Sequence, residues 1–455
     1  MIKKVFLFVF FSSTLFSLQA YEVKVDIDGI KNQYCKLAFY YGDKQLLRDS
    51  TLLDNKGVGV FQKEEVLENG IYLIVLPNNK YFELLIDTTD QKFSLATDTM
   101  ALVDHLKLKN ASYSTTKFVD YIKYLAKASK DVDKIMLNKD GSRKEKLTDE
   151  ENKKKSLIDK DVNEYKSALI SHQPNSLVAS IVKSTNEIQV PKELQGRDQW
   201  LYFRNHYFDN INFAEVGLLR TPIFDKKFKY FIDKLNYQIP DSMIAASDMI
   251  IEKAKANKEI YKYVVSNLTN KFANSKNMGM DEVFHHLGQK YYLDQKAWWV
   301  DSTTKQKIYE RVIKVKYNLI GNRAVPFSMV DLDGIKHKLY DVQAEYTILV
   351  FWSSSCGHCK KTMPLIKDIY EEYRDREVKV VGVNIDKKEE DWRKYLEKND
   401  YDWLNLWDGN NLTNFRTFYN VDSTPIIYVL DQQKTIIAKR IDPKTLEKIL
   451  EDNIN

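Results

Sequence analysis

The residues of this chain best suited to chemistry are two cysteines three positions apart, Cys356 and Cys359, with Gly357 and His358 between them. Two thiols at this spacing can interconvert between a dithiol and a disulfide, or they can supply half of a metal site. A zinc site needs two further ligands, and the sequence has only one other cysteine, Cys35, and no second cysteine pair. We therefore predict disulfide exchange that needs no metal and no cofactor.

The surrounding sequence predicts different roles for the two thiols. An apolar run precedes the pair and a helical pattern over residues 363–373 follows it, so the pair should lie at the N-terminus of a helix. The unpaired N–H groups and the dipole of a helix N-terminus stabilise a thiolate, so we expect Cys356 to attack and the more buried Cys359 to resolve the mixed disulfide. A protonated His358 would make the couple more oxidising, whereas Gly357 would leave it unchanged.

Residues 321–455 contain the elements that would position this pair. The run at 378–385 is almost continuously apolar, as in a strand covered on both faces. The order strand, helix, strand, helix, then two strands and a helix, predicts an α/β domain with a thioredoxin arrangement. The predicted strands include 347–352, 378–385, 426–430 and 435–439, and the predicted helices include 389–398, 412–419 and 446–450.

Two further domains are predicted before this one, so the chain is multidomain. Residues 21–112 contain alternating strands separated by turn residues and predict an all-β, sandwich-like domain. Residues 113–320 have a helical period and predict an all-α domain, with one helix beginning near Thr148 after a polar loop. Cys35 lies in a strand-like alternation of the first domain, and we expect it to be buried rather than reactive.

The first 20 residues are typical of a signal peptide. Lys3 and Lys4 precede an apolar run at 5–18, and Ala20 ends an acceptable cleavage site. The run is shorter than the roughly 20 residues that span a bilayer, and no cysteine follows it, so neither a membrane helix nor a lipoprotein anchor is indicated. We expect export to the periplasm, an oxidising compartment.

Composition excludes some classes of protein. The net charge is +5 over 455 residues, and basic and acidic residues are mixed along the chain, so nothing indicates a nucleic-acid partner. Three cysteines are too few for a small secreted domain that several disulfide bonds stabilise. The cysteine pair is therefore expected to serve chemistry.

The C-terminal third resembles the TlpA/ResA-like branch of thioredoxin-fold thiol-disulfide oxidoreductases. The whole chain is also similar to a multidomain group from Gram-negative bacteria, which has a β-rich N-terminal domain and a helical middle domain of unknown function. This resemblance implies an enzyme that reduces or isomerises disulfides in protein clients. If it is a reductase, export separates it from cytosolic thioredoxin reductase, so it would need a membrane thiol reductant as its electron source. The matching elements are Ala324–Phe327, Asp333–Gly334, Phe351–Trp352, Cys356, Cys359–Lys361, Pro364 and Thr424–Pro425.

The resemblance also implies a substrate-binding wall beside Cys356. The Thr424–Pro425 bond would be cis, and the backbone of Thr424 would pair with an extended substrate. Trp352, at the end of the predicted strand, is the third residue expected to contact substrate.

Two positions depart from the family pattern. Many members carry a glutamate where this chain has Thr362, and thioredoxin has a buried aspartate where it has Val350. Both carboxylates accept the proton of the resolving thiol. A water molecule, Glu345 or Asp386 could accept the proton here, and the sequence does not choose among them.

Two other functions are compatible with the sequence. A peroxiredoxin-like peroxidase would have Ser or Thr where Ser353 stands, three residues before Cys356, but the proline and arginine expected around a peroxide are not evident. Alternatively, residues 21–320 could be a non-enzymatic envelope binding or scaffold module with an appended thioredoxin domain.

Overall fold

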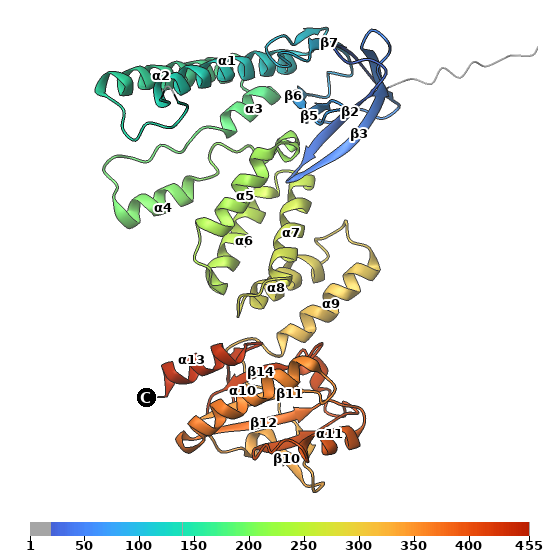
Figure 1. The fold of residues 1–455 in the computed structure, drawn as a ribbon, viewed down its shortest axis with the longest axis vertical. Coiled ribbons are helices and arrows are strands. Elements are labelled where there is room, and N and C mark those ends of the chain that lie inside the picture. The colour runs from blue at the N-terminus through green and yellow to red at the C-terminus, as the bar shows by residue number, and fades with distance from the viewer. Residues whose placement is uncertain (1–19, 139, 455) are drawn as a thin grey trace, which may run out of the picture. The chain divides into compact units, whose positions relative to one another are not determined.

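The computed structural model describes residues 20–138 and 140–454, and it divides into two compact units. The first unit runs to Leu235 and includes Ala254–Ile260, and the second contains Asn236–Lys253 and the chain from Tyr261 (Figure 1). The predicted signal peptide, apart from residue 20, lies outside the described residues. Within those residues, no helix combines the length and the apolar content needed to cross a membrane. The domain boundaries at 112 and 320 stay predictions.

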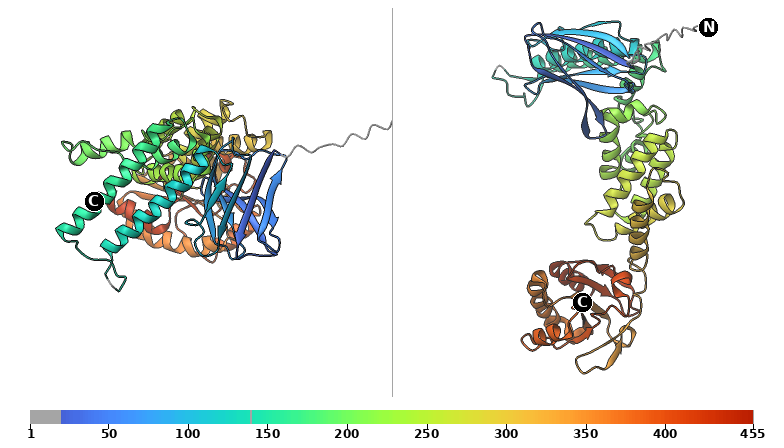
Figure 2. Two further views of the ribbon diagram at one scale, coloured as in Figure 1. Left: turned by 90° about the horizontal axis from the view of Figure 1, so that it is seen from above. Right: turned by 90° about the vertical axis from the view of Figure 1, so that its right-hand side faces the viewer.

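The β-rich part of the first unit, drawn in blue shades in Figure 2, consists of two four-stranded sheets. Their strand orders are β4-β1-β7-β8 and β3-β2-β5-β6. Every second residue of β1 is buried, as expected for a strand with one face on a core. This confirms the all-β prediction. The strands are β1 (Tyr21–Asp28), β2 (Tyr34–Tyr41), β3 (Lys44–Leu52), β4 (Val58–Lys63), β5 (Gly70–Val75), β6 (Tyr81–Ile86), β7 (Lys92–Asp98) and β8 (Lys107–Lys109).

Cys35 is fully buried in the core of this region. Its thiol donates a hydrogen bond to the carbonyl oxygen of Val75 at 3.5 Å. Burial raises the pKa of Cys35 to about 12, so the thiolate is scarce at neutral pH. The prediction of a buried side chain is confirmed.

The middle of the chain is helical, as predicted. Helix α2 begins where the sequence indicated: Thr148 is its N-cap and forms a capping box with Glu151. The α-helices are α1 (Tyr113–Met136), α2 (Asp149–His172), α3 (Leu177–Ser184), α4 (Gly196–His206), α5 (Pro222–Lys234), α6 (Pro240–Ala254), α7 (Lys258–Ala273), α8 (Asp281–Leu287) and α9 (Ser302–Lys316). The 3₁₀-helix η1 (Val216–Arg220) lies between α4 and α5, and the π-helix η2 (Gly288–Leu293) follows α8.

The C-terminal part of the second unit contains a seven-stranded sheet with the order β10-β9-β13-β12-β11-β14-β15. Strand β11 pairs in parallel with β12 and antiparallel with β14, which confirms the α/β thioredoxin arrangement. The strands are β9 (Ser328–Val330), β10 (Lys336–Lys338), β11 (Tyr346–Trp352), β12 (Val378–Asn384), β13 (Leu404–Trp407), β14 (Ile426–Leu430) and β15 (Ile436–Lys439). The helices are η3 (Leu339–Asp341), α10 (Gly357–Tyr373), η4 (Arg374–Arg376), α11 (Glu389–Leu396), α12 (Phe415–Phe418) and α13 (Pro443–Asn453).

Strand β11 is central because its side chains enter two separate cores. Ile348, Val350 and Trp352 face one core together with α10, whereas Leu349 and Phe351 face the other. Alternate side chains of a strand point to opposite faces, so a strand covered on both sides has a continuously apolar sequence. Burial on both faces fixes the end of β11, and with it the start of the loop that leads to Cys356.

Candidate active site at Cys356 and Cys359

Cys356 lies where the chain turns from β11 into α10. It is the N-cap residue of α10, and its sulfur accepts a hydrogen bond from the backbone N–H of Cys359 at 3.3 Å. The backbone N–H of Cys356 donates to the carbonyl of Ser353, which closes the turn. The sulfur thus takes the place that a Ser or Asp oxygen occupies in other helix caps, and the helix N-terminus stabilises negative charge on it.

The two thiols are free and differ in exposure and in pKa. Cys356 is partly exposed, whereas Cys359 is 1% exposed. Burial alone would raise the pKa of Cys356, but hydrogen bonds from the side chains of Cys359 and Thr424 and from the N–H groups of Cys359 and His358 bring it below its ordinary value. Burial, with a hydrogen bond to Cys356, raises the pKa of Cys359 to about 12. At neutral pH the accessible sulfur is therefore the better nucleophile.

The segment 424–425 lies beside Cys356, although it is far away in the sequence. The Thr424–Pro425 peptide bond is cis, which confirms that prediction. The thiol of Cys356 donates a hydrogen bond to the carbonyl oxygen of Thr424 at 3.3 Å. The backbone of Thr424 therefore contacts the sulfur that a client disulfide would approach.

The two residues between the cysteines lie on the surface, whereas Trp352, before them, lies in the core. Gly357 and His358 are both exposed, and a Cβ added at Gly357 would meet open space. Trp352 is fully buried, and its ring packs against Tyr395 with centroids 5.2 Å apart. A fully buried side chain supports the site from inside the domain, so the position of Trp352 gives no support to the prediction that it binds substrate.

Asp386, one of the candidate proton acceptors for Cys359, lies next to the active-site loop. Asp386 follows β12 and accepts hydrogen bonds from the hydroxyl of Ser353, from the N–H of Ser354 at 2.7 Å and from Asn384 at 3.1 Å. Burial raises its pKa, but these hydrogen bonds outweigh the effect and hold the pKa below its ordinary range. Asp386 is therefore ionised at neutral pH, close to the loop that carries Cys356.

The other candidate carboxylate is remote. Glu345 stands before the first residue of β11, and its N–H donates to the carbonyl of Glu377 at 2.8 Å. The seven residues of β11 separate it from the active-site loop, roughly 23 Å of extended chain. Glu345 therefore cannot take a proton from Cys359 directly. Val350 is buried in the core, and Thr362 is partly exposed on α10.

Ser353 does not have the surroundings that a peroxidatic site would need. Its hydroxyl contacts Asp386 and the hydroxyl of Ser355 at 2.9 Å, and no described hydrogen bond joins it to the sulfur of Cys356. The Ser353 hydroxyl, whose position suggested a peroxidase, therefore hydrogen-bonds a carboxylate and not the sulfur. Among the described residues, no group of three or more His, Cys, Asp or Glu side chains is arranged to hold a metal ion.

Two parts of the chain match known protein families, one in the helical region and one in the C-terminal α/β region. Residues 139–318 match a family described as a domain of unknown function (DUF5106), and residues 344–436 match a family described as thioredoxin-like. The thioredoxin-like protein YneN of Bacillus subtilis is 32% identical over 119 residues, which cover 26% of this chain and 68% of YneN. The thiol-disulfide oxidoreductase ResA of Bacillus cereus is 26% identical over 130 residues, 29% of this chain and 74% of ResA.

Solved structures include similar chains. A thioredoxin-like protein from Bacteroides caccae aligns with 59% of this chain and 98% of its own length, at 21% identity and a TM-score of 0.49. A domain of a possible thiol-disulfide isomerase from Cytophaga hutchinsonii aligns with 30% of this chain and 92% of its own length, at 41% identity and a TM-score of 0.28.

Proposed function

We propose that this chain, whose C-terminal region belongs to the thioredoxin-like family and is a thiol-disulfide oxidoreductase, reduces or isomerises disulfides in envelope proteins after export. The observation that carries the proposal is the asymmetry of the cysteine pair. One sulfur is accessible, caps a helix and has a lowered pKa, and the other is buried one turn away with a raised pKa. This asymmetry suits a nucleophile and a resolving thiol.

The reaction then has two exchange steps. The thiolate of Cys356 attacks one sulfur of a client disulfide, forms a mixed disulfide and releases the other client sulfur as a thiolate. Cys359 loses its proton and attacks the sulfur of Cys356, which releases the second client thiolate and leaves a Cys356–Cys359 disulfide. Two electrons have passed to the client. A dithiol reductant, which we place in the membrane, must then reduce the enzyme.

Asp386 is the carboxylate that we assign to the proton released by Cys359. It hydrogen-bonds the hydroxyl of Ser353, and the backbone of Ser353 is also a hydrogen-bond partner of the Cys359 thiol. A bridging water molecule would carry the proton from the thiol to this ionised carboxylate, because a backbone amide does not pass a proton on. Its low pKa means that it keeps the proton only briefly and returns it to water.

Client trapping tests the proposed function. Cys359→Ser should attack clients but fail to release them, so mixed disulfides through Cys356 should accumulate in the periplasm of the producing cells. Cys356→Ser is the matched control and should form no mixed disulfide. Capture of proteins without a mixed disulfide in either variant would instead support a binding or scaffold protein, and peroxide consumption by the wild type without disulfide reduction would support a peroxidase.

A further inference from the structure

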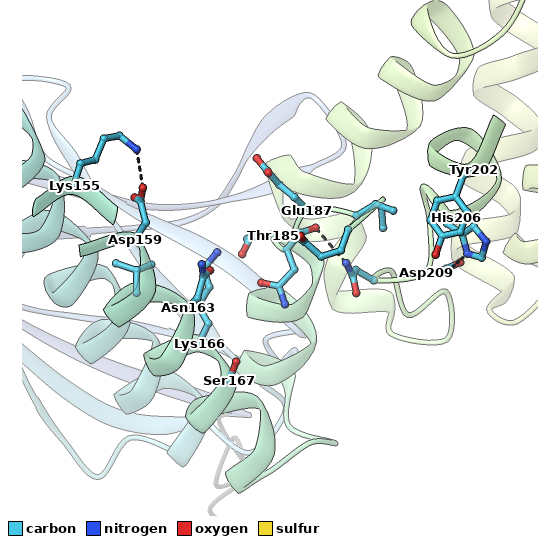
Figure 3. A pocket seen from close by; sticks show the side chains of 15 residues that line it. Lys155, Asp159, Asn163, Lys166, Ser167, Thr185, Glu187, Tyr202, His206 and Asp209 are labelled. Carbon is cyan, nitrogen blue, oxygen red and sulfur yellow. Dashed lines mark hydrogen bonds and ion pairs between the residues drawn. The ribbon is translucent and has the colours of Figure 1, made fainter. Parts of the chain in front are cut away.

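The helical part of the first unit contains a polar groove of about 900 Å³ whose lining residues include no cysteine (Figure 3). One face of α2 forms one wall, and Tyr202 and His206 of α4, with Asp209 and Asn210, form the other. The chain from Thr185 to Gln189 lies between these walls. The residues of α2 that line the groove are spaced three or four apart or adjacent, so they share one side of the helix. They are Lys155, Asp159, Val162, Asn163, Lys166 and Ser167.

The segment 186–190, which we name the open strand, has the character of a strand without a partner. Its residues alternate between half-buried and exposed, the period of an extended chain. Among the described residues, no hydrogen bond reaches the backbone N–H or C=O groups of Glu187, Ile188, Gln189 and Val190. A row of unpaired backbone groups is a template for a second extended chain.

The side chains around the open strand are also suited to hydrogen-bonding an uncharged peptide backbone. The charges are largely compensated: Lys155 pairs with Asp159 at 2.6 Å, and His206 pairs with Asp209 at 2.6 Å. Burial lowers the pKa of Lys166, and the nearby Glu187 opposes that effect. This balance disfavours a strongly charged ligand. The side-chain amide of Asn210 already donates to the backbone carbonyl of Asn186 at 3.3 Å. The other amides of the lining can donate and accept hydrogen bonds, as a peptide group does; they are Asn163, Asn186 and Gln189.

The volume of the groove agrees with this kind of occupant. An added strand rises about 3.3 Å per residue, lies about 4.8 Å from its neighbour and needs about 10 Å to the next layer, or about 160 Å³ per residue. A volume of about 900 Å³ therefore holds roughly five to six residues, close to the length of the open strand. We infer that this groove binds an extended, unfolded polypeptide segment, which adds to residues 186–190 as a strand. The choice of a client polypeptide rests on the proposed function.

Binding of an unfolded protein that contains no thiol or disulfide tests the inference separately from the redox chemistry. Fluorescein-labelled, reduced and carboxymethylated α-lactalbumin cannot react with Cys356, so fluorescence anisotropy with the full chain reports docking alone. We expect saturable binding that Asn163→Trp weakens about tenfold by filling the groove. Ala168→Trp adds the same side chain at an exposed α2 position outside the groove and should bind as the wild type does. No binding by the wild type, or equal binding by both variants, would overturn the inference.

Proline substitutions test the addition of a strand. Ile188→Pro and Gln189→Pro each remove one backbone N–H, and successive N–H groups of a strand point in opposite directions. Only one variant should therefore weaken binding, by about fivefold for one lost hydrogen bond. Each proline variant is compared with its alanine control, Ile188→Ala or Gln189→Ala, which loses the same side chain but keeps the N–H. The other proline variant should bind as its alanine control does, and thermal unfolding confirms that each variant is folded. Equal binding by all the variants, or an equal loss in both proline variants, contradicts the inference. Disulfide reduction by the same proteins shows independently whether the proposed function holds.

Discussion

Cys356 and Cys359 differ chemically although one helical turn separates them. The partly exposed sulfur receives hydrogen bonds from the helix N-terminus, and the buried sulfur is 1% exposed. Desolvation acts on both thiols, but only at Cys356 do hydrogen bonds to the sulfur overcome it. The position in the helix, more than the residue type, therefore makes the pKa of one thiol lower than that of the other.

The first prediction concerns the hydrogen bond between the two thiols. The side chain of Cys359 is the strongest of the groups that lower the pKa of Cys356, so Cys359→Ala should raise that pKa. The hydrogen bonds from Thr424 and from the two N–H groups remain, so the pKa should rise by less than burial alone would raise it. The pH dependence of iodoacetamide alkylation measures both values. An unchanged midpoint in Cys359→Ala would show that the helix N-terminus alone sets the pKa.

The second prediction concerns Asp386. Asp386→Asn keeps the size of the side chain but removes the proton acceptor, so resolution of a preformed mixed disulfide by Cys359 should slow by about 100-fold, while attack by Cys356 changes little. Rapid-mixing kinetics of the two steps separate these effects. Glu345→Gln is the matched control at the far end of β11 and should resolve at the wild-type rate. Equal resolution rates in Asp386→Asn and the wild type would exclude Asp386 as the proton acceptor.

At the scale of elements, strand β15 is bonded to helix α8 and to the residues that follow α9, all of which precede the sheet in the sequence. Lys439 is 3% exposed, and its ammonium group donates to the carboxylate of Asp281 at 2.5 Å and to the carbonyl of Asn318 at 2.6 Å. All three residues belong to the second unit. Burial lowers the pKa of Lys439, and Asp281 opposes that effect. The charged form of the buried Lys439 is therefore stabilised by its partners.

The third prediction compares the loss of either partner of this ion pair. Asp281→Ala leaves a buried ammonium group without its carboxylate and should lower the free energy of unfolding by about 3 kcal/mol. Lys439→Met removes the buried charge and keeps a long apolar side chain, so its cost should be smaller. Urea unfolding of the full chain, followed through the transition of the second unit, measures both. A larger loss for Lys439→Met would contradict this account of the pair.

The sequence predicted the central strands and the cysteine loop because each leaves a local signal. Strand β11 is apolar on both faces, and Thr424–Pro425 precedes another buried strand. Strand β13 was missed because it has four residues and the polar Asn405 interrupts it. The predicted helix at 412–419 is wrong in length: only Phe415–Phe418 is helical, because the Asp408 carboxylate accepts the N–H groups of Leu412 and Thr413 and holds them in a loop.

The residues themselves predicted the part of the site that is close in sequence, whereas Thr424–Pro425 was placed beside Cys356 only by the family resemblance. The contact of Ser353 with Asp386 joins residues 33 positions apart, and it depends on the pairing of β11 with β12. The groove beside residues 186–190 was not predicted, because an unpaired extended segment between helices has the sequence of an ordinary loop. Its signal is the absence of backbone partners, which only a structure shows.

At the scale of the whole molecule, the redox domain and part of the helical region form one compact unit. The fourth prediction is that residues 321–455 alone are less stable than residues 236–455, because Lys439 loses Asp281 and Asn318 when the chain is shortened. Urea unfolding of the two fragments should differ by about 3 kcal/mol. Equal stabilities would show that the sheet does not depend on the preceding helices.

The reduction potential of the Cys356–Cys359 pair tests the proposed function most directly. It is measured by equilibrating the full chain with dithiothreitol or glutathione redox buffers and trapping the thiols with acid. A reductase or isomerase should give one reversible two-electron transition at about −180 mV or below, a transition that Cys356→Ser abolishes. A potential near −120 mV, typical of a strong periplasmic oxidant, or the absence of a reversible transition, would contradict the account.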